Sequence, residues 1–208
     1  MGREESSHDL PPPNTIWSIL DHFIVELGAK GDAICSEEPA IKKQLYIGLV
    51  NLVCRGDTSV LGYFGAGGPY YHLILVAYYL LFHKKSSTGR HLLTKLRFAY
   101  NMHPFTFSDD ERCMMGALID VSNKRPVVFT ESDSALCKAF KHLVMYHLTN
   151  DARYIAEAEK ELEEYEKMLN EPIEQEIRDA YNVIEHRYTS PLFLFLKHVV
   201  SRVRSYAH

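Results

Sequence analysis

The sequence lacks the residue patterns that mark the common metal and nucleotide sites. None of its 11 histidines has a second histidine four residues away, so the HExxH pattern of helical zinc sites is absent. The cysteines include no CxxC pair and show no short regular spacing, which argues against a zinc ribbon and against a disulfide framework. The four cysteines are Cys35, Cys54, Cys113 and Cys137. We therefore expect neither a metal nor a cofactor.

The sequence also lacks an apolar run long enough to cross a membrane. Its most apolar uncharged stretch, residues 69–82, has 14 residues, whereas a bilayer-spanning helix needs about 20. The N-terminus is polar and contains no apolar signal region. We expect an intracellular protein, in the cytoplasm or the nucleus, with no transmembrane span. Membrane attachment would require acylation at Gly2, where Met1-Gly2 with Ser6 matches the N-myristoylation pattern in outline.

The central element of the predicted fold is a helix over residues 69–83. Its apolar residues occupy every side, which is typical of a helix buried in a protein core. The rest of the chain shows apolar residues at helical spacing, separated by proline, glycine and capping residues. We predict an all-α single-domain bundle of about eight or nine helices around this central helix. The domain is expected to cover residues 14–208, with 151–208 as an alternative C-terminal subregion, after a flexible arm over 1–13.

Glycine and capping residues locate several of the expected helix ends. Gly28 is expected to end the first helix, and Ser36 to begin the second. Residues 86–89, Ser-Ser-Thr-Gly, are expected to form a turn before the next helix. Ser108 and Glu111 have the spacing of a capping box, which predicts a helix N-terminus there.

Glycines are concentrated just before the central helix, between Gly62 and Gly68. Such a loop can present backbone N–H groups to a phosphate at the positive end of the helix dipole. It lacks the Gly-Lys-Ser/Thr ending of a nucleotide P-loop and the spacing of the dinucleotide fingerprint. A tight turn that needs glycine for its backbone geometry explains the composition equally well. A small-ligand or enzyme site in this loop, with Gly65, Gly67 and Gly68 around a phosphate, is therefore our lowest-ranked hypothesis.

No acidic residue occurs between Asp57 and Asp109. Lysines and arginines cluster in this interval, and Phe98 and Tyr100 lie among them. Basic side chains beside aromatic rings suit binding to a phosphate backbone with base stacking. The candidate nucleic-acid-binding residues are Lys84, Lys85, Arg90, Lys95 and Arg97. The alternative is that these charges balance an acidic segment of the same chain or of another copy.

The net charge of −4 is unevenly distributed. Residues 151–176 carry a net charge of −7, and the segment 186–208 contains basic residues but no acidic one. If this last segment lies beside residues 84–97 in the fold, the two form one basic face opposite the acidic helix.

Two helical segments in the C-terminal part have apolar surfaces that a partner helix would cover. In the acidic helix, apolar residues at alternating spacings of three and four form a narrow seam. In the last helix, two phenylalanines lie off the main stripe, so this helix is either buried on more than one side or meets a partner. The candidate partner-interface residues are Ile155, Leu162, Tyr165, Leu169, Phe193 and Phe195.

No constellation of residues in the sequence requires catalysis. We predict a non-enzymatic macromolecular interaction protein, either self-associating or an adaptor, with a protein partner or a second copy as its ligand. An RNA- or DNA-binding protein that uses segment 84–97 is the second hypothesis. An enzyme is the third.

Overall fold

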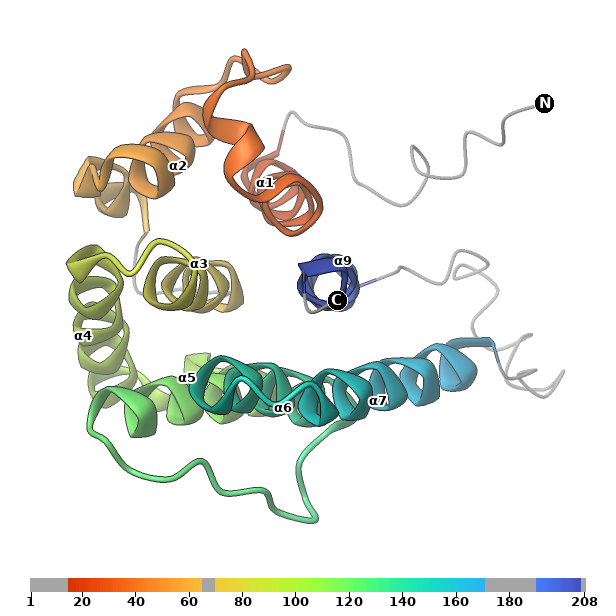
Figure 1. Cartoon of the computed structure of the whole chain (residues 1–208). Helices are drawn as coiled ribbons and strands as arrows, with labels where there is room; N and C mark the ends of the chain where they lie inside the picture. Colours follow the sequence, from red (N-terminus) through yellow and green to blue (C-terminus); the bar gives the residue numbers. More distant parts are fainter. Residues whose placement is uncertain (1–14, 65–69, 171–189, 207–208) are drawn as a thin grey trace, which may run out of the picture.

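The computed structural model describes residues 15–64, 70–170 and 190–206, and within these ranges it contains helices and no strand. The protein is an all-α bundle, as predicted (Figure 1). The α-helices are α1 (Ile16–Lys30), α2 (Gln44–Arg55), α3 (Tyr71–Phe82), α4 (Ser87–Met102), α5 (Asp109–Ser122), α6 (Ala135–Thr149), α7 (Arg153–Asn170) and α9 (Pro191–Tyr206). Three 3-10 helices connect them: η1 (Gly31–Cys35), η2 (Thr58–Tyr63) and η3 (Pro104–Thr106).

Helix α3 is the predicted central helix. Every residue from His72 to Leu80 is buried, because an apolar surface on all sides can be removed from water only by neighbours on all sides. The helix begins at Tyr71, with Tyr70 at its N-cap, two residues later than predicted. The backbone N–H of Tyr70 donates to Glu111 of α5, so this buried carboxylate holds the N-terminal end of α3.

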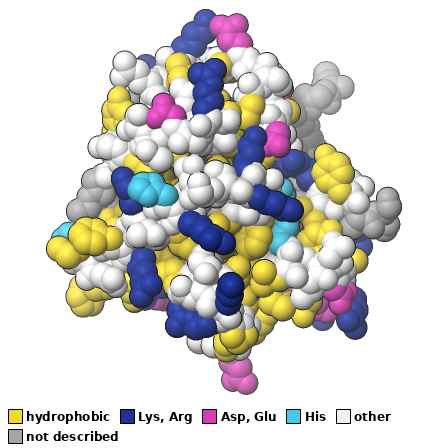
Figure 2. All heavy atoms as spheres, turned by 60° about the vertical axis from the view of Figure 1, so that its left-hand side comes forward, with side chains coloured by type: hydrophobic (Ala, Val, Ile, Leu, Met, Phe, Trp, Pro, Cys, Tyr) yellow, Lys and Arg dark blue, Asp and Glu magenta, His cyan; other side chains and the backbone are white. Residues whose placement is uncertain are grey.

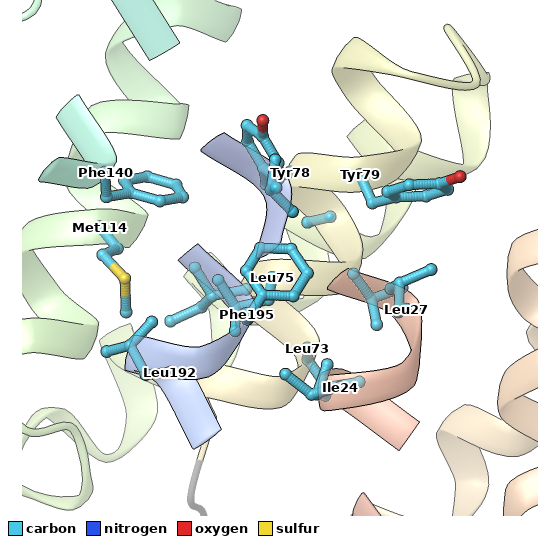
Figure 3. Packing of buried hydrophobic residues seen from close by; sticks show 14 of the residues in the cluster. Ile24, Leu27, Leu73, Leu75, Tyr78, Tyr79, Met114, Phe140, Leu192 and Phe195 are labelled. Atoms are coloured by element: carbon cyan, nitrogen blue, oxygen red, sulfur yellow. The ribbon is translucent and has the colours of Figure 1, made fainter. Parts of the chain in front are cut away.

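Helix α9 completes the core beside α3. Phe195 is fully buried and lies among side chains of α1 and α3, with Phe140 of α6 on the other side (Figure 3). Helix α1 passes so close to α9 that a Cβ at Gly28 would lie 3.0 Å from the Cα of Phe195. Gly28 therefore serves close helix packing, and the prediction that it ends α1 is wrong. The helix ends at Gly31, whose φ of 57° favours glycine.

The start of α4 shows the same difference between a glycine in the sequence and its role in the fold. The predicted turn at residues 86–89 is the N-terminus of α4, where the Ser86 hydroxyl accepts the N–H of Thr88. Gly89 lies inside the helix, and a Cβ there would be 3.0 Å from the backbone nitrogen of Leu81. The glycine lets α4 pack closely against the end of α3.

The predicted N-terminus of α2 is wrong, and that of α5 is correct. Helix α2 begins at Gln44, eight residues after Ser36. The intervening segment contains Pro39, which lacks the N–H that a helix interior requires. The capping box at Ser108 and Glu111 is present in both directions at the start of α5.

All four cysteines are paired, which corrects the prediction that the chain has no disulfides. Cys35 at the end of η1 is bonded to Cys54 of α2, with a Cα–Cα distance of 5.7 Å. Cys113 of α5 is bonded to Cys137 of α6, with a Cα–Cα distance of 6.3 Å. Folding brings together cysteines that are 19 and 24 residues apart, a separation that spacing rules for metal motifs do not detect. Because disulfides persist in oxidising compartments, the cysteine pattern gives no support to the predicted intracellular location.

No helix in the described ranges is both long enough and apolar enough to cross a membrane, in line with the prediction. The connection between α5 and α6 passes through Val128 and Phe129, which are exposed at the surface.

Candidate functional site

Helix α4 carries the surface whose chemistry is least explained by packing. One side of the helix is buried against α3 through Leu92, Leu93 and Leu96. Its other side is exposed and carries basic and apolar side chains together. Figure 2 shows the side of the molecule on which α4 lies, where dark blue Lys and Arg side chains are interspersed with yellow hydrophobic ones.

A groove of about 330 Å³ runs along α4 where it meets η2 and the start of α3. Its walls are mostly apolar, and the side chains with polar groups in its lining are those of Tyr70, Lys95 and His103. The lining residues are Leu61, Phe64, Tyr70, Leu73, Leu92, Lys95, Leu96, Phe98, Ala99, Met102 and His103. None of the described residues that line the groove has a carboxylate, so its electrostatic character is set by Lys95.

Large apolar side chains stand at the rim of this groove in contact with solvent. Phe98 is 67% exposed and Met102 is 59% exposed, both on α4. Clustered exposed apolar side chains beside a concave apolar surface are typical of binding sites.

The predicted nucleic-acid-binding residues fall into two groups in the fold. Lys84 lies 3.1 Å from Asp32 and is therefore held in an ion pair within the chain. The others are exposed, and in the described part of the chain no carboxylate lies within 4.0 Å of them. These are Lys85, Arg90, Lys95 and Arg97. Only Lys95 lines the groove.

The second basic segment does not join this face, which corrects the expectation of one shared basic face. Helix α9 packs against α1, α6 and α7, whereas α4 packs against α3, α5 and η3. Lys197 of α9 lies 3.5 Å from Glu166 of α7, and Arg204 is paired with Glu159. Helix α7 therefore forms ion pairs with Lys197 and Arg204 of α9 within the same chain, and in the described ranges it forms none with α4.

The predicted partner-interface residues are largely inside the chain. Ile155, Leu162, Phe193 and Phe195 are buried, because α7 packs on α6 and α9. Tyr165 and Leu169 are partly buried, and the ring of Tyr165 lies 5.1 Å from that of Phe193. The neighbouring helices of the same chain thus cover the seam. Gly65, Gly67, Gly68 and Gly2 lie outside the described residues.

A buried polar cluster lies between the C-terminal ends of α3 and α6. The hydroxyl of Tyr78 is 2.7 Å from Nε2 of His147 and 3.4 Å from Nε2 of His83. Burial, together with the nearby Arg202 guanidinium, lowers the pKa of His83 to about 4, and burial lowers the pKa of His147 to about 4. Burial also raises the pKa of Tyr78 well above its ordinary value. All three side chains are therefore neutral at pH 7, and the cluster is an uncharged hydrogen-bonded part of the core.

Two other polar clusters serve the fold. Nε2 of buried His72 lies 2.7 Å from Oδ1 of Asp21, which also accepts the Tyr71 hydroxyl and so ties α3 to α1. In the described ranges, the one group of ligand-type atoms close enough for a metal ion is Cys113, Asp133 and Cys137. Its two sulfurs form a disulfide, and Oδ2 of Asp133 is 2.6 Å from Nζ of the buried Lys141.

The groove was missed by the sequence analysis because its residues come from three separate elements. A partial signal was present in α4, where Phe98 and Met102 lie off the apolar face formed by Leu92 and Leu96. Comparisons with protein-family models, curated proteins and solved structures find no match for the chain.

Proposed function

We propose that this chain is a non-enzymatic interaction protein that binds an acidic, amphipathic helical segment of a protein partner along α4. The observation that carries the proposal is the coincidence of an apolar groove with basic side chains that have no acidic neighbour in the described ranges.

The groove favours a peptide helix over a flat polar ligand. An amphipathic helix places apolar side chains from one face into a groove of this kind. Phe98 and Met102 would pack beside these anchors, since apolar side chains that remain exposed gain the most from being covered. Lys95 at the groove edge would attract carboxylates on the partner, and Arg90 and Arg97 add positive charge on another exposed side of α4.

Nucleic acid is the second candidate ligand. It is favoured by Arg90, Lys95 and Arg97 standing exposed on one helix beside Phe98, whose ring is free for a base to stack on. Two observations count against it. Lys84 is already paired with Asp32, and the overall pI near 6.3 is low for a nucleic-acid-binding domain.

The test compares two synthetic peptides of equal length and helicity, in which leucines at helical spacing are flanked by glutamates in one and by lysines in the other. We expect the acidic peptide to bind, measured by fluorescence anisotropy at low salt, and the basic peptide not to bind. Lys95→Glu should raise the Kd for the acidic peptide at least about tenfold, equivalent to about 1.4 kcal/mol of binding free energy. Phe98→Ala should raise the Kd for this peptide by a similar factor.

Lys43→Glu is the matched control, because Lys43 is an exposed lysine before α2 that does not line the groove. This variant should bind the acidic peptide within about twofold of the wild type. Labelled single-stranded and double-stranded RNA and DNA are titrated in the same buffers. Binding of nucleic acid without binding of the acidic peptide would overturn the proposal in favour of the second candidate. Equal losses of peptide affinity in the Lys95 and Lys43 variants would show that the peptide does not bind at the α4 groove.

A further inference from the structure

We propose that the partner segment is α7 of a second copy of this chain, so that copies associate head to tail through α4 and α7. This inference rests on the proposed function of the α4 face and names its partner. The argument depends on two stripes of side chains with matching spacing and opposite charge, all of them exposed except the half-buried Glu161.

The first stripe lies on α4 and is called the basic stripe. It consists of His91, Lys95, Phe98 and Met102. The second lies on α7 and is called the acidic stripe. It consists of Glu157, Glu161, Glu164 and Met168. Both have successive spacings of four, three and four residues, which keep four side chains on one side of a helix over about 16 Å.

The acidic stripe is available in the described part of the chain. Helix α7 uses Glu159 and Glu166, on its other flank, to pair with α9. Within the described ranges, no Lys, Arg or His side chain lies within 4.0 Å of the carboxylates of the stripe. Met168, at its C-terminal end, is 65% exposed. Helix α7 is thus divided into a flank neutralised inside the chain and a flank that is not.

Laid side by side in the same direction, the two stripes place opposite charges and apolar groups together. Glu161 then faces Lys95, Glu157 faces His91, and Met168 lies next to Met102 at the groove, while Glu164 lies opposite Phe98. Close helix packing brings the axes to about 8–10 Å, a distance at which such side chains meet. A methionine suits an irregular groove because its thioether is flexible and polarizable.

The two stripes of one chain cannot meet each other. Helices α4 and α7 lie at opposite ends of the molecule, with α3, α5, α6 and α9 between them (Figure 1). Pairing must therefore join different copies, and each copy offers one basic and one acidic stripe. A contact between two different surfaces is heterologous, so it builds rings or open chains instead of stopping at a symmetric dimer.

The experiment uses the full chain and two variants, each of which loses one stripe. The first variant is Lys95→Gln with Phe98→Ser, and the second is Glu157→Gln with Glu161→Gln and Glu164→Gln. Neutral replacements are chosen because reversed charges on both stripes would again attract each other. The control is Glu159→Gln with Glu166→Gln, which removes two carboxylates from the opposite flank of α7. Helical circular dichroism checks that every variant is folded.

Sedimentation velocity at low salt should show wild-type and control species that grow with concentration beyond two chains of 23.9 kDa each. Each stripe variant alone should remain a single chain. An equimolar mixture of the two should form a complex of two chains and stop there, because one contact is possible and both remaining surfaces are inactive. Moderate salt should weaken every association, since the Debye length falls to about 8 Å at physiological ionic strength.

Three results would overturn the inference: a wild-type chain that stays single at all concentrations, an oligomer that survives in both stripe variants, or stripe variants that do not recombine. Its failure is separable from failure of the proposed function. If the acidic peptide binds the α4 face but the wild-type chain stays single, the proposed function stands and the partner is another protein. If the peptide does not bind and the chain stays single, both are rejected.

Discussion

Helices α4 and α9 are similar in composition but differ in how far their aromatic and basic side chains are buried or paired in the fold. Each combines several basic residues with aromatic ones and contains no acidic residue. In α9 Phe193 and Phe195 are buried, and Lys197 and Arg204 are paired with carboxylates of α7. In α4 Phe98 is exposed, and no described carboxylate pairs with Arg90, Lys95 or Arg97. The difference teaches that a basic segment indicates a binding surface only where the fold provides no internal counter-charge.

The test with the largest expected effect on stability replaces one phenylalanine in each helix. Phe195→Ala should lower the free energy of unfolding by about 3–5 kcal/mol, because it leaves a cavity in the fully buried core. Phe98→Ala should change it by no more than about 0.5 kcal/mol, since the ring is exposed. Urea unfolding followed by circular dichroism measures both. Similar losses for the two variants would mean that α4 is packed as α9 is, and would remove the basis for the proposed site.

The disulfides sharpen the comparison, because they join α2 and α6 to their neighbours and neither involves α4 or α9. Replacing Cys113 and Cys137 together by serine should destabilise the protein by about 3 kcal/mol, since a closed loop of this length restricts the unfolded chain. The same change should leave peptide binding at the α4 face unaltered within about twofold. Thermal unfolding and mass analysis after alkylation of unreduced protein provide the readouts. Free thiols in the unreduced wild type would contradict this prediction.

The third test concerns Arg202 of α9, which lies close to the partly buried His83, whereas Arg90, Lys95 and Arg97 of α4 are exposed to solvent. Burial and this guanidinium hold the pKa of His83 at about 4, and burial does the same for His147. In the unfolded chain both histidines take up a proton near their ordinary pKa of 6.5. Below that pH the unfolded state therefore binds more protons, so stability should fall as the pH drops from about 6.5 to about 4.

Denaturant unfolding at a series of pH values tests this expectation. His83→Gln with His147→Gln should flatten the pH dependence of the free energy of unfolding between these values. Arg202→Gln should raise the pKa of His83 in the folded state, so the part of the stability loss that is due to His83 should end at a higher pH. The double variant His91→Gln with His103→Gln, near or in the α4 groove, is the control and should retain the wild-type profile. A wild-type stability that is constant between pH 6.5 and 4 would contradict the neutral buried cluster.

The smallest expected effect comes from the surface charges themselves. Lys197→Gln and Arg204→Gln each remove an ion pair with α7, and each should cost about 0.2–1 kcal/mol of stability. Arg90→Gln and Arg97→Gln should cost nothing measurable, because they remove no ion pair in the described ranges. Added salt should reduce the cost for the α9 variants. Equal costs on the two helices would show that α4 has internal partners too.

Two parts of the fold could be predicted from the sequence because they depend on local chemistry. The uniformly apolar composition of residues 72–80 leaves burial as the sole favourable environment, and α3 is buried over this stretch. The capping box of α5 is likewise a contact between residues three positions apart. The predictions for Gly28 and Gly89 failed because each glycine serves contact with a distant helix, and no local pattern records such a contact.

The sequence by itself determined that the chain is helical, that α3 is central and that positive and negative charge occupy different segments. Helical periodicity and composition carry this information, since both are properties of neighbouring residues. Only the tertiary structure decided which cysteines pair, that α7 neutralises α9 and not α4, and that three elements form one groove. These features join residues far apart in the chain, and their formation depends on how whole helices pack.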